Sequence, residues 1–94
     1  MYPRLRCQVG SNAFIYEITK PRTSVGREQD NDVVLCNNKV SRKHAEIVFN
    51  GSAFEIVDNH STNKVIVNGL FVERTILKSG DIIGLGETVI TFMC

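Results

Sequence analysis

Three polar segments of the chain carry side chains that can bind an oxyanion. Gly26 and Arg27 form the first, residues 41–44 (Ser-Arg-Lys-His) the second, and residues 59–63 (Asn-His-Ser-Thr-Asn) the third. Arginine offers a planar, permanently charged fork, and hydroxyl and backbone N–H groups add charge-assisted hydrogen bonds. The same residue types are also ordinary in turns. If the fold brings the three segments to one end, they make a shallow anion-binding site.

The elements that must position these segments are short strands. Val and Ile together number 20 residues, and Leu and Ala together number 8, a bias that favours pleated sheets over helices. Apolar and polar residues alternate in short runs with turn signals every eight to twelve residues, and no run has the 3.6-residue period of a helix. The pattern predicts about ten strands, at residues 5–9, 14–18, 23–26, 33–35, 44–49, 53–57, 65–67, 70–72, 82–85 and 88–93.

Two Asn-Gly pairs predict hairpins. Asn50-Gly51 separates two of the expected strands, and Asn68-Gly69 separates two others by two residues. Asn-Gly supplies the positive φ angles that a type I′ turn requires. Short strands at this spacing are typical of an all-β sandwich or barrel, and binding residues then belong on the loops.

Length and composition limit the function classes. The 94 residues form one domain, 1–94, with a net charge of +1, which disfavours nucleic-acid binding through charge alone. No apolar run approaches the roughly 18 residues of a membrane helix, and the N-terminus lacks the apolar region of a signal peptide. Cys7, Cys36 and Cys94 are widely spaced, which indicates reduced thiols in a cytosolic or nuclear protein and no metal or cofactor site.

Catalysis is one alternative that the residue types permit. Ser41, His44, Asp58 and His60 could supply a hydrolytic triad. The chain has no G-x-S-x-G nucleophile elbow, and no paired carboxylates accompany an apolar pocket signal. We therefore expect no enzymatic activity and no catalytic residue.

Nucleic-acid binding is a second alternative. Lys39, Arg42, Lys43 and Lys64 could form a basic cluster. Aromatic residues are not interleaved with them, so a surface for stacking bases is not expected.

Five motifs in order resemble the forkhead-associated (FHA) family, which reads phosphorylated motifs. They are matched at spacings that cover the chain from about Leu5 to Phe92. The motifs are Gly26-Arg27, Ser41-x-x-His44, Ser61-Thr62-Asn63, Val67-Asn68-Gly69 and Gly80-Asp81 followed by Ile83-Gly84.

The resemblance implies an all-β, two-sheet sandwich of about eleven short strands that binds phosphothreonine peptides through loops at one end. By this resemblance Arg27 pairs with the phosphate, Ser41 donates its hydroxyl to it, and Arg42 adds a second polar contact. Thr62 touches the phosphothreonine region, and Asn63 holds the peptide backbone. The implied function is recruitment of a phosphorylated partner protein, without cofactor, metal, nucleic acid or membrane.

Other motif residues are implied to support the site. Gly26 and His44 are expected to be architectural, with His44 hydrogen-bonded within the loops, and Asn68 and Gly69 are expected to form a turn.

The sequence departs from the family pattern after Asn63. The family has Gly and then Thr at the next two positions, where this chain has Lys64 and Val65. If the first position requires a positive φ, lysine is strained there by roughly 1 kcal/mol. Lys64 then either adds a cation near the phosphate, obstructs the peptide, or points away. We include it among the expected phosphopeptide-binding residues.

The resemblance also suggests a setting, namely the N-terminal domain of a nuclear DNA-damage-response adaptor. The departure at Lys64 motivates an alternative function, a phospho-independent homodimerisation or scaffold module with an idle or weakened phosphate pocket. In that alternative, exposed apolar residues such as Phe71, Val72 or residues 33–35 contribute a patch, unless they belong to the core.

Overall fold

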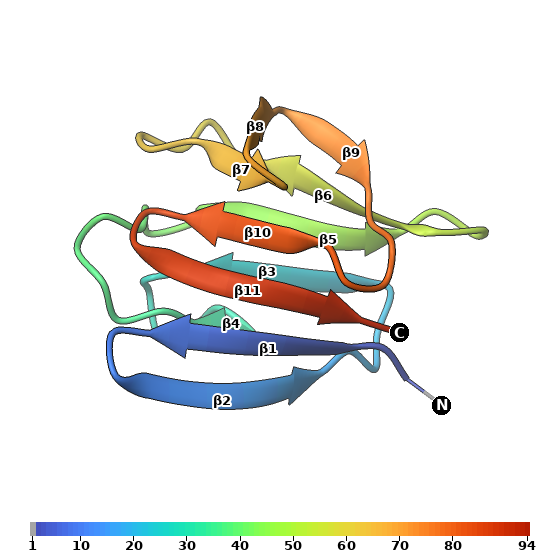
Figure 1. Ribbon diagram of the computed structural model, residues 1–94, viewed down its shortest axis with the longest axis horizontal. Coiled ribbons are helices and arrows are strands. Elements are labelled where there is room, and N and C mark those ends of the chain that lie inside the picture. Colours follow the sequence, from blue (N-terminus) through green and yellow to red (C-terminus); the bar gives the residue numbers. More distant parts are fainter. Residues whose placement is uncertain (1) are drawn as a thin grey trace.

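The chain folds into two mainly antiparallel sheets that face each other (Figure 1). The computed structural model describes residues 2–94. One sheet has six strands in the order β2-β1-β11-β10-β7-β8, and the other has five in the order β4-β3-β5-β6-β9. The strands are β1 (Arg4–Val9), β2 (Asn12–Glu17), β3 (Arg22–Gly26), β4 (Val33–Val34), β5 (Ala45–Phe49), β6 (Phe54–Asp58), β7 (Val65–Val67), β8 (Leu70–Val72), β9 (Arg74–Ile76), β10 (Ile82–Leu85) and β11 (Thr88–Met93). The predicted all-β sandwich is confirmed.

The core lies between the two sheets. Successive side chains of each strand point to opposite faces of its sheet, so every second residue points into the core. In β1, Leu5 and Cys7 are fully buried, and they pair with Phe92 and Ile90 of β11. The intervening residues of β1 point outward and are polar. Seventeen buried apolar residues form one continuous cluster, to which Val and Ile contribute most, so the branched-residue bias in the sequence reflects a pleated core.

The predicted Asn68-Gly69 turn is confirmed. It closes the β7–β8 hairpin with φ angles of 50° and 85°, both positive as a type I′ turn requires. The Asn50-Gly51 pair also lies in a hairpin, but the register joins Phe49 to Phe54, so this loop has four residues and not two.

One strand was not predicted from the sequence. The structure also shows which of the apolar residues considered for a surface patch belong to the core. Strand β9 was missed because Arg-Thr-Ile shows no alternation long enough to read; it pairs with β6 across Glu55, Ile56 and Val57. Val33 and Leu35 are buried in the core, whereas Phe71 is 73% exposed on β8.

Residues 2–94 contain no α-helix, and so no helix there is long and apolar enough to cross a membrane. The three cysteines are free, with Cys7 buried and Cys36 and Cys94 exposed.

Candidate functional site

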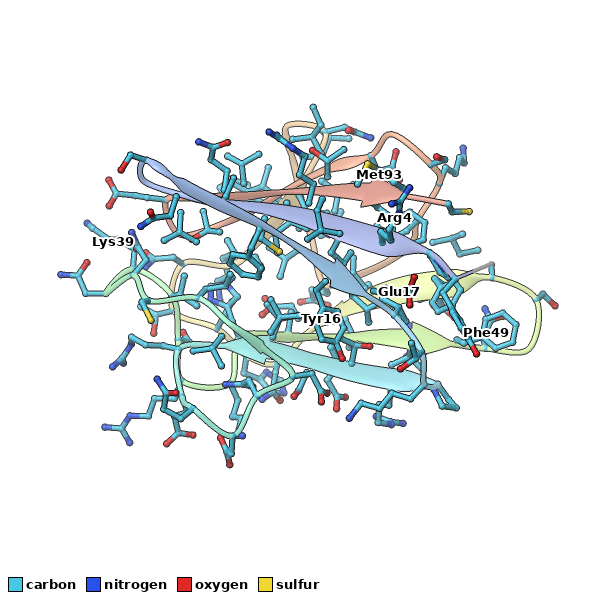
Figure 2. All side chains as sticks on the ribbon, turned by 90° about the horizontal axis from the view of Figure 1, so that it is seen from below. Arg4, Tyr16, Glu17, Lys39, Phe49 and Met93 are labelled. Atoms are coloured by element: carbon cyan, nitrogen blue, oxygen red, sulfur yellow. The ribbon has the colours of Figure 1, made fainter. Side chains whose placement is uncertain are left out.

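The three segments predicted to bind an oxyanion lie in loops at the same end of the sandwich. They are the β3–β4 loop (residues 27–32), the β4–β5 loop (35–44) and the β6–β7 loop (59–64). In Figure 1 these loops lie at the left, at the end opposite both chain termini. Lys39 marks this end in Figure 2, across the molecule from Phe49 and Met93. The strand topology therefore brings the three predicted segments to one end of the sandwich.

Arg27 is fixed through its backbone and its Nε atom. Its backbone N–H donates to the Ser41 carbonyl at 3.0 Å, and Nε donates to the Val40 carbonyl at 3.0 Å. The two terminal guanidinium nitrogens have no hydrogen-bond partner among residues 2–94. The side chain is exposed, so the fork is held at its base while its charged end remains available.

Ser41 connects the β4–β5 loop to the β6–β7 loop. Its Oγ accepts a hydrogen bond from the Thr62 backbone N–H at 3.1 Å. Because the hydroxyl accepts in that bond, its own proton remains free to be donated outward. Ser41 is half-buried and Thr62 is exposed, so this proton lies at the surface of the site.

His44 is buried between two loops and holds them together. Its Nδ1 accepts from the Ser41 backbone N–H at 3.0 Å, and its Nε2 lies 2.7 Å from the Lys64 carbonyl oxygen. These partners require the neutral tautomer with the proton on Nε2. The hydrogen bonds expected of His44 are therefore present, and the ring has no free nitrogen for catalysis.

The β6–β7 loop is fixed by Asp58 and contains two strained residues. Asp58 Oδ1 accepts from Ser61 N at 3.0 Å and from Ser61 Oγ at 2.5 Å. His60 and Lys64 have φ angles of 52° and 66°, in the left-handed region that favours glycine. The condition considered for Lys64 in the sequence, a positive φ, is therefore met. Val65, the second departure from the family pattern, is fully buried in the core.

Asn63 is also tied to another loop. Its Nδ2 donates to the Lys39 carbonyl at 2.7 Å. The side-chain oxygen of Asn63 remains an available acceptor at the surface. Asn63 therefore sets the distance between the β4–β5 and β6–β7 loops.

Two glycines allow the loops to approach closely. A Cβ added at Gly26 would lie 2.2 Å from the Arg42 carbonyl oxygen and 2.8 Å from Asn31 Nδ2. A Cβ added at Gly86, in the β10–β11 turn, would lie 2.6 Å from the Lys39 carbonyl oxygen. The absence of a side chain at both glycines therefore allows the β4–β5 loop to lie close against the sandwich.

Two supporting residues were not predicted from the sequence. Asn31 is buried, and its Nδ2 donates to the Glu28 and Arg42 carbonyls, both at 2.8 Å. An asparagine in a polar loop gives no signal for this role. Gly86 lies in the two-residue turn between β10 and β11, and its contact with Lys39 depends on the tertiary structure.

Basic side chains around the site are largely unpaired. Lys39, Arg42 and Lys64 are exposed and have no acidic partner among residues 2–94. Lys43 differs because its Nζ lies 2.7 Å from Asp30 Oδ1, and this bond holds the pKa of Asp30 below its usual value. Three basic side chains of these loops therefore remain without an acidic partner among the described residues.

Two groupings made from the sequence require correction. Asn68 and Gly69 lie at the far end of β7 from Lys64, where Asn68 bonds Asp81 and Ile82, so they support the β7–β8 hairpin and not the binding loops. The candidate catalytic triad is not assembled, because Asp58 bonds Ser61 and not a histidine.

A groove of about 640 Å³ adjoins the β6–β7 loop. Val57, Phe71 and Val72 give it an apolar floor, and His60, Lys64 and Arg74 are among its polar residues.

The fold and the loops define a β-sandwich recognition domain whose functional groups lie at one end. The FHA domain family model matches residues 23–86, and the chain belongs to the FHA family.

The chain is also similar to individual proteins and solved structures. The chain is 37% identical over 76 residues to the glycogen accumulation regulator GarA of Mycolicibacterium smegmatis, covering 81% of this chain and 48% of GarA. It is 36% identical to the oxoglutarate dehydrogenase inhibitor of Corynebacterium efficiens, covering 81% and 54%. A structure from an analysis of phosphothreonine-dependent FHA domain interactions has a TM-score of 0.92, with 32% identity and coverage of 100% and 97%.

The chain thus spans about half the length of these curated relatives. Both are named as a regulator or an inhibitor, which agrees with a non-enzymatic role. Neither name supports a DNA-damage-response adaptor, and nuclear localisation stays a prediction.

Proposed function

We propose that this chain binds a phosphothreonine of a partner protein through the loops around Arg27 and Ser41. The observation that carries the proposal is the anchored Arg27 guanidinium beside a hydroxyl that retains a free proton. A solved FHA structure at TM-score 0.92 comes from a study of phosphothreonine-dependent interactions, which supports the same ligand class.

The phosphate would occupy the space between Arg27 and Ser41. A phosphothreonine carries about −1.5 to −2 charges and three strong acceptor oxygens. The Arg27 terminal nitrogens would donate two parallel hydrogen bonds, and Ser41 would donate its hydroxyl proton. Arg42 and the Thr62 hydroxyl, both exposed on the same loops, would add further donors.

The peptide backbone would lie along the β6–β7 loop. Asn63 uses its amide nitrogen on Lys39, so its oxygen would accept an N–H group of the peptide. Lys64 would add a cation whose attraction weakens with salt. The groove between Lys64 and Phe71 would receive a side chain that neighbours the phosphothreonine.

The biological role would be recruitment or regulation of a partner after a kinase has modified it. Relatives named as regulators support this direction. The nuclear, DNA-damage-response setting remains a separate proposal, and microscopy of the tagged full-length protein would test the location. Two observations favour the alternative, phospho-independent scaffold role: the exposed Phe71 side chain and the exposed edge strand β2.

The experiment is fluorescence anisotropy with a peptide selected from a degenerate phosphothreonine library. We expect binding to require the phosphate and to disappear in Arg27→Ala. Arg22→Ala is the matched control, because Arg22 pairs with Glu46 on the sheet surface away from the loops. If a folded wild-type chain shows no preference for the phosphorylated library, the proposal is wrong.

A further inference from the structure

Strand β2 is a long edge strand that is paired on one side only. It has six residues (Asn12–Glu17) and pairs only with β1. The other edge strands, β4, β8 and β9, have two, three and three residues. Figure 2 views the molecule from the β2 side, with Tyr16 and Glu17 labelled on this strand. A row of free N–H and C=O groups of this length can pair with another strand.

The edge lacks the features by which soluble proteins block such pairing. The sequence from Asn12 to Glu17 contains no proline or lysine, and its register with β1 is continuous, without a bulge. Glu17 is its only charged residue. Phe14 and Ile15 are 38% and 52% exposed, although both are apolar.

The free backbone groups belong to alternate residues. Ile18 donates its N–H to the Pro3 carbonyl at 2.9 Å. The even-numbered residues of this segment therefore direct their backbone N–H and C=O groups towards β1. In an antiparallel pair, successive residues direct their backbone groups to opposite sides. Ala13, Ile15 and Glu17 therefore direct theirs to the free edge, and the three are symmetric about Ile15.

We infer that β2 pairs with β2 of a second copy of this chain, antiparallel, around a twofold axis at Ile15. Ile15 then lies opposite Ile15 of the second copy, and Ala13 lies opposite Glu17. Each pair exchanges two backbone hydrogen bonds. Phe14 lies opposite Tyr16 of the second copy at the closely spaced positions between them, which forms two aromatic cross-strand pairs.

Charge and symmetry favour a second copy over an unrelated strand. Each Glu17 faces an alanine across the interface and has Arg4 opposite it on β1, so no like charges meet. The net charge of +1 gives the two chains little mutual repulsion. One register satisfies all six free groups of both edges, which is the self-complementarity that a twofold interface requires.

The pairing also fixes the relation between the two binding ends. Strand β2 begins at the Gly10-Ser11 turn, at the same end as the binding loops (Figure 1). Antiparallel pairing joins the six-stranded sheets into one and directs the two loop clusters to opposite ends. If the proposed function holds, the dimer links two separate phosphorylated partners; the pairing itself does not depend on that function.

The test is sedimentation equilibrium from micromolar to millimolar concentration. We expect the mass to rise from 10.5 kDa towards that of a dimer. Ile15→Lys and Ile15→Glu each place like charges opposite one another, so each variant should dimerise at least tenfold more weakly. Because Ile15 meets its own counterpart, an equimolar mixture of the two variants should recover the dimer.

The control is Leu70→Lys, which adds the same charge at a 69% exposed residue on the other edge of the same sheet. It should leave dimerisation unchanged. Unchanged circular dichroism and phosphopeptide affinity in Ile15→Lys would show that the fold is intact. A monomer at every concentration overturns the inference, as does a dimer that Ile15→Lys does not weaken or a mixture that stays monomeric.

Discussion

The buried His44 ring lies 2.7 Å from the carbonyl oxygen of Lys64, a residue with a φ of 66°. This contact joins the residue that departs most from the family pattern to the residue that holds the loops together. The strained backbone at Lys64 is thus kept in place by a partly buried hydrogen bond, which leaves the loop in the shape that glycine normally permits.

Replacing Lys64 with glycine should stabilise the chain. The left-handed conformation costs a non-glycine residue about 1–2 kcal/mol, and glycine loses about 0.5–1 kcal/mol of that gain through unfolded-state entropy. We expect a net gain of about 0.5–1 kcal/mol in the free energy of unfolding, measured by urea denaturation. Lys64→Ala is the control, because it removes the charge and keeps the strain. Equal stability of the two variants would contradict this account.

Gly86→Ala should destabilise the chain more than Gly10→Ala. The two glycines have nearly equal φ angles, 62° and 60°, but only at Gly86 would the new Cβ meet another segment, 2.6 Å from the Lys39 carbonyl oxygen. The strain of about 1–2 kcal/mol is common to both, and overpacking adds about 1–3 kcal/mol at Gly86. Denaturation midpoints measure the difference, and equal midpoints would show that Lys39 moves away freely.

The sequence predicted the strands and the loop chemistry, because both are local. Alternation located ten strands, and the Asn68-Gly69 turn followed from its φ requirements. What it could not show were contacts between distant segments. Asn31 reaches Arg42, and Gly86 lies against Lys39, only because the sheets bring these loops together.

Site geometry was predictable to a similar extent. Arg27 and Ser41 could be chosen by side-chain type, but the bond from Arg27 Nε to the Val40 carbonyl depends on how the β4–β5 loop is folded. The Asn68-Gly69 turn was placed correctly in the chain but grouped wrongly with the binding loops, because the sequence does not show that β7 carries the chain away from those loops before it turns.

Asp81 should contribute stability that is lost in acid. Its carboxylate accepts hydrogen bonds from the Lys78 backbone and from Asn68, and these bonds lower its pKa from the ordinary value of 3.8. A lowered folded-state pKa gives stability above the unfolded value, which disappears as the pH falls through the folded value. The melting temperature of wild type should therefore exceed that of Asp81→Asn at pH 7, and the difference should shrink below pH 3.8. Glu87→Gln, at an exposed residue, is the control; a pH-independent gap for Asp81→Asn would refute the linkage.

Two of the three cysteines should react with a thiol reagent in the native state. Cys36 and Cys94 are exposed, whereas burial raises the pKa of the Cys7 thiol to about 12. Because the thiolate is the nucleophile, Cys7 should react only when the chain unfolds. Titration with a chromogenic disulfide at pH 8 should give two fast equivalents, and a third in denaturant. Three fast equivalents would mean that β1 opens readily.

Arg27→Lys should separate the charge of Arg27 from its geometry. Arginine anchors itself through Nε to Val40 and retains two terminal nitrogens for a phosphate. Lysine has one ammonium group, which cannot occupy both positions, so the variant keeps the charge and loses the fork. A hydrogen bond to a charged group is worth about 1.5–3 kcal/mol, so phosphopeptide affinity should fall by roughly 10- to 100-fold. Arg22→Lys, made on the sheet surface, should leave affinity unchanged. Isothermal titration calorimetry measures both, and near-wild-type binding by Arg27→Lys would mean that charge alone attracts the phosphate.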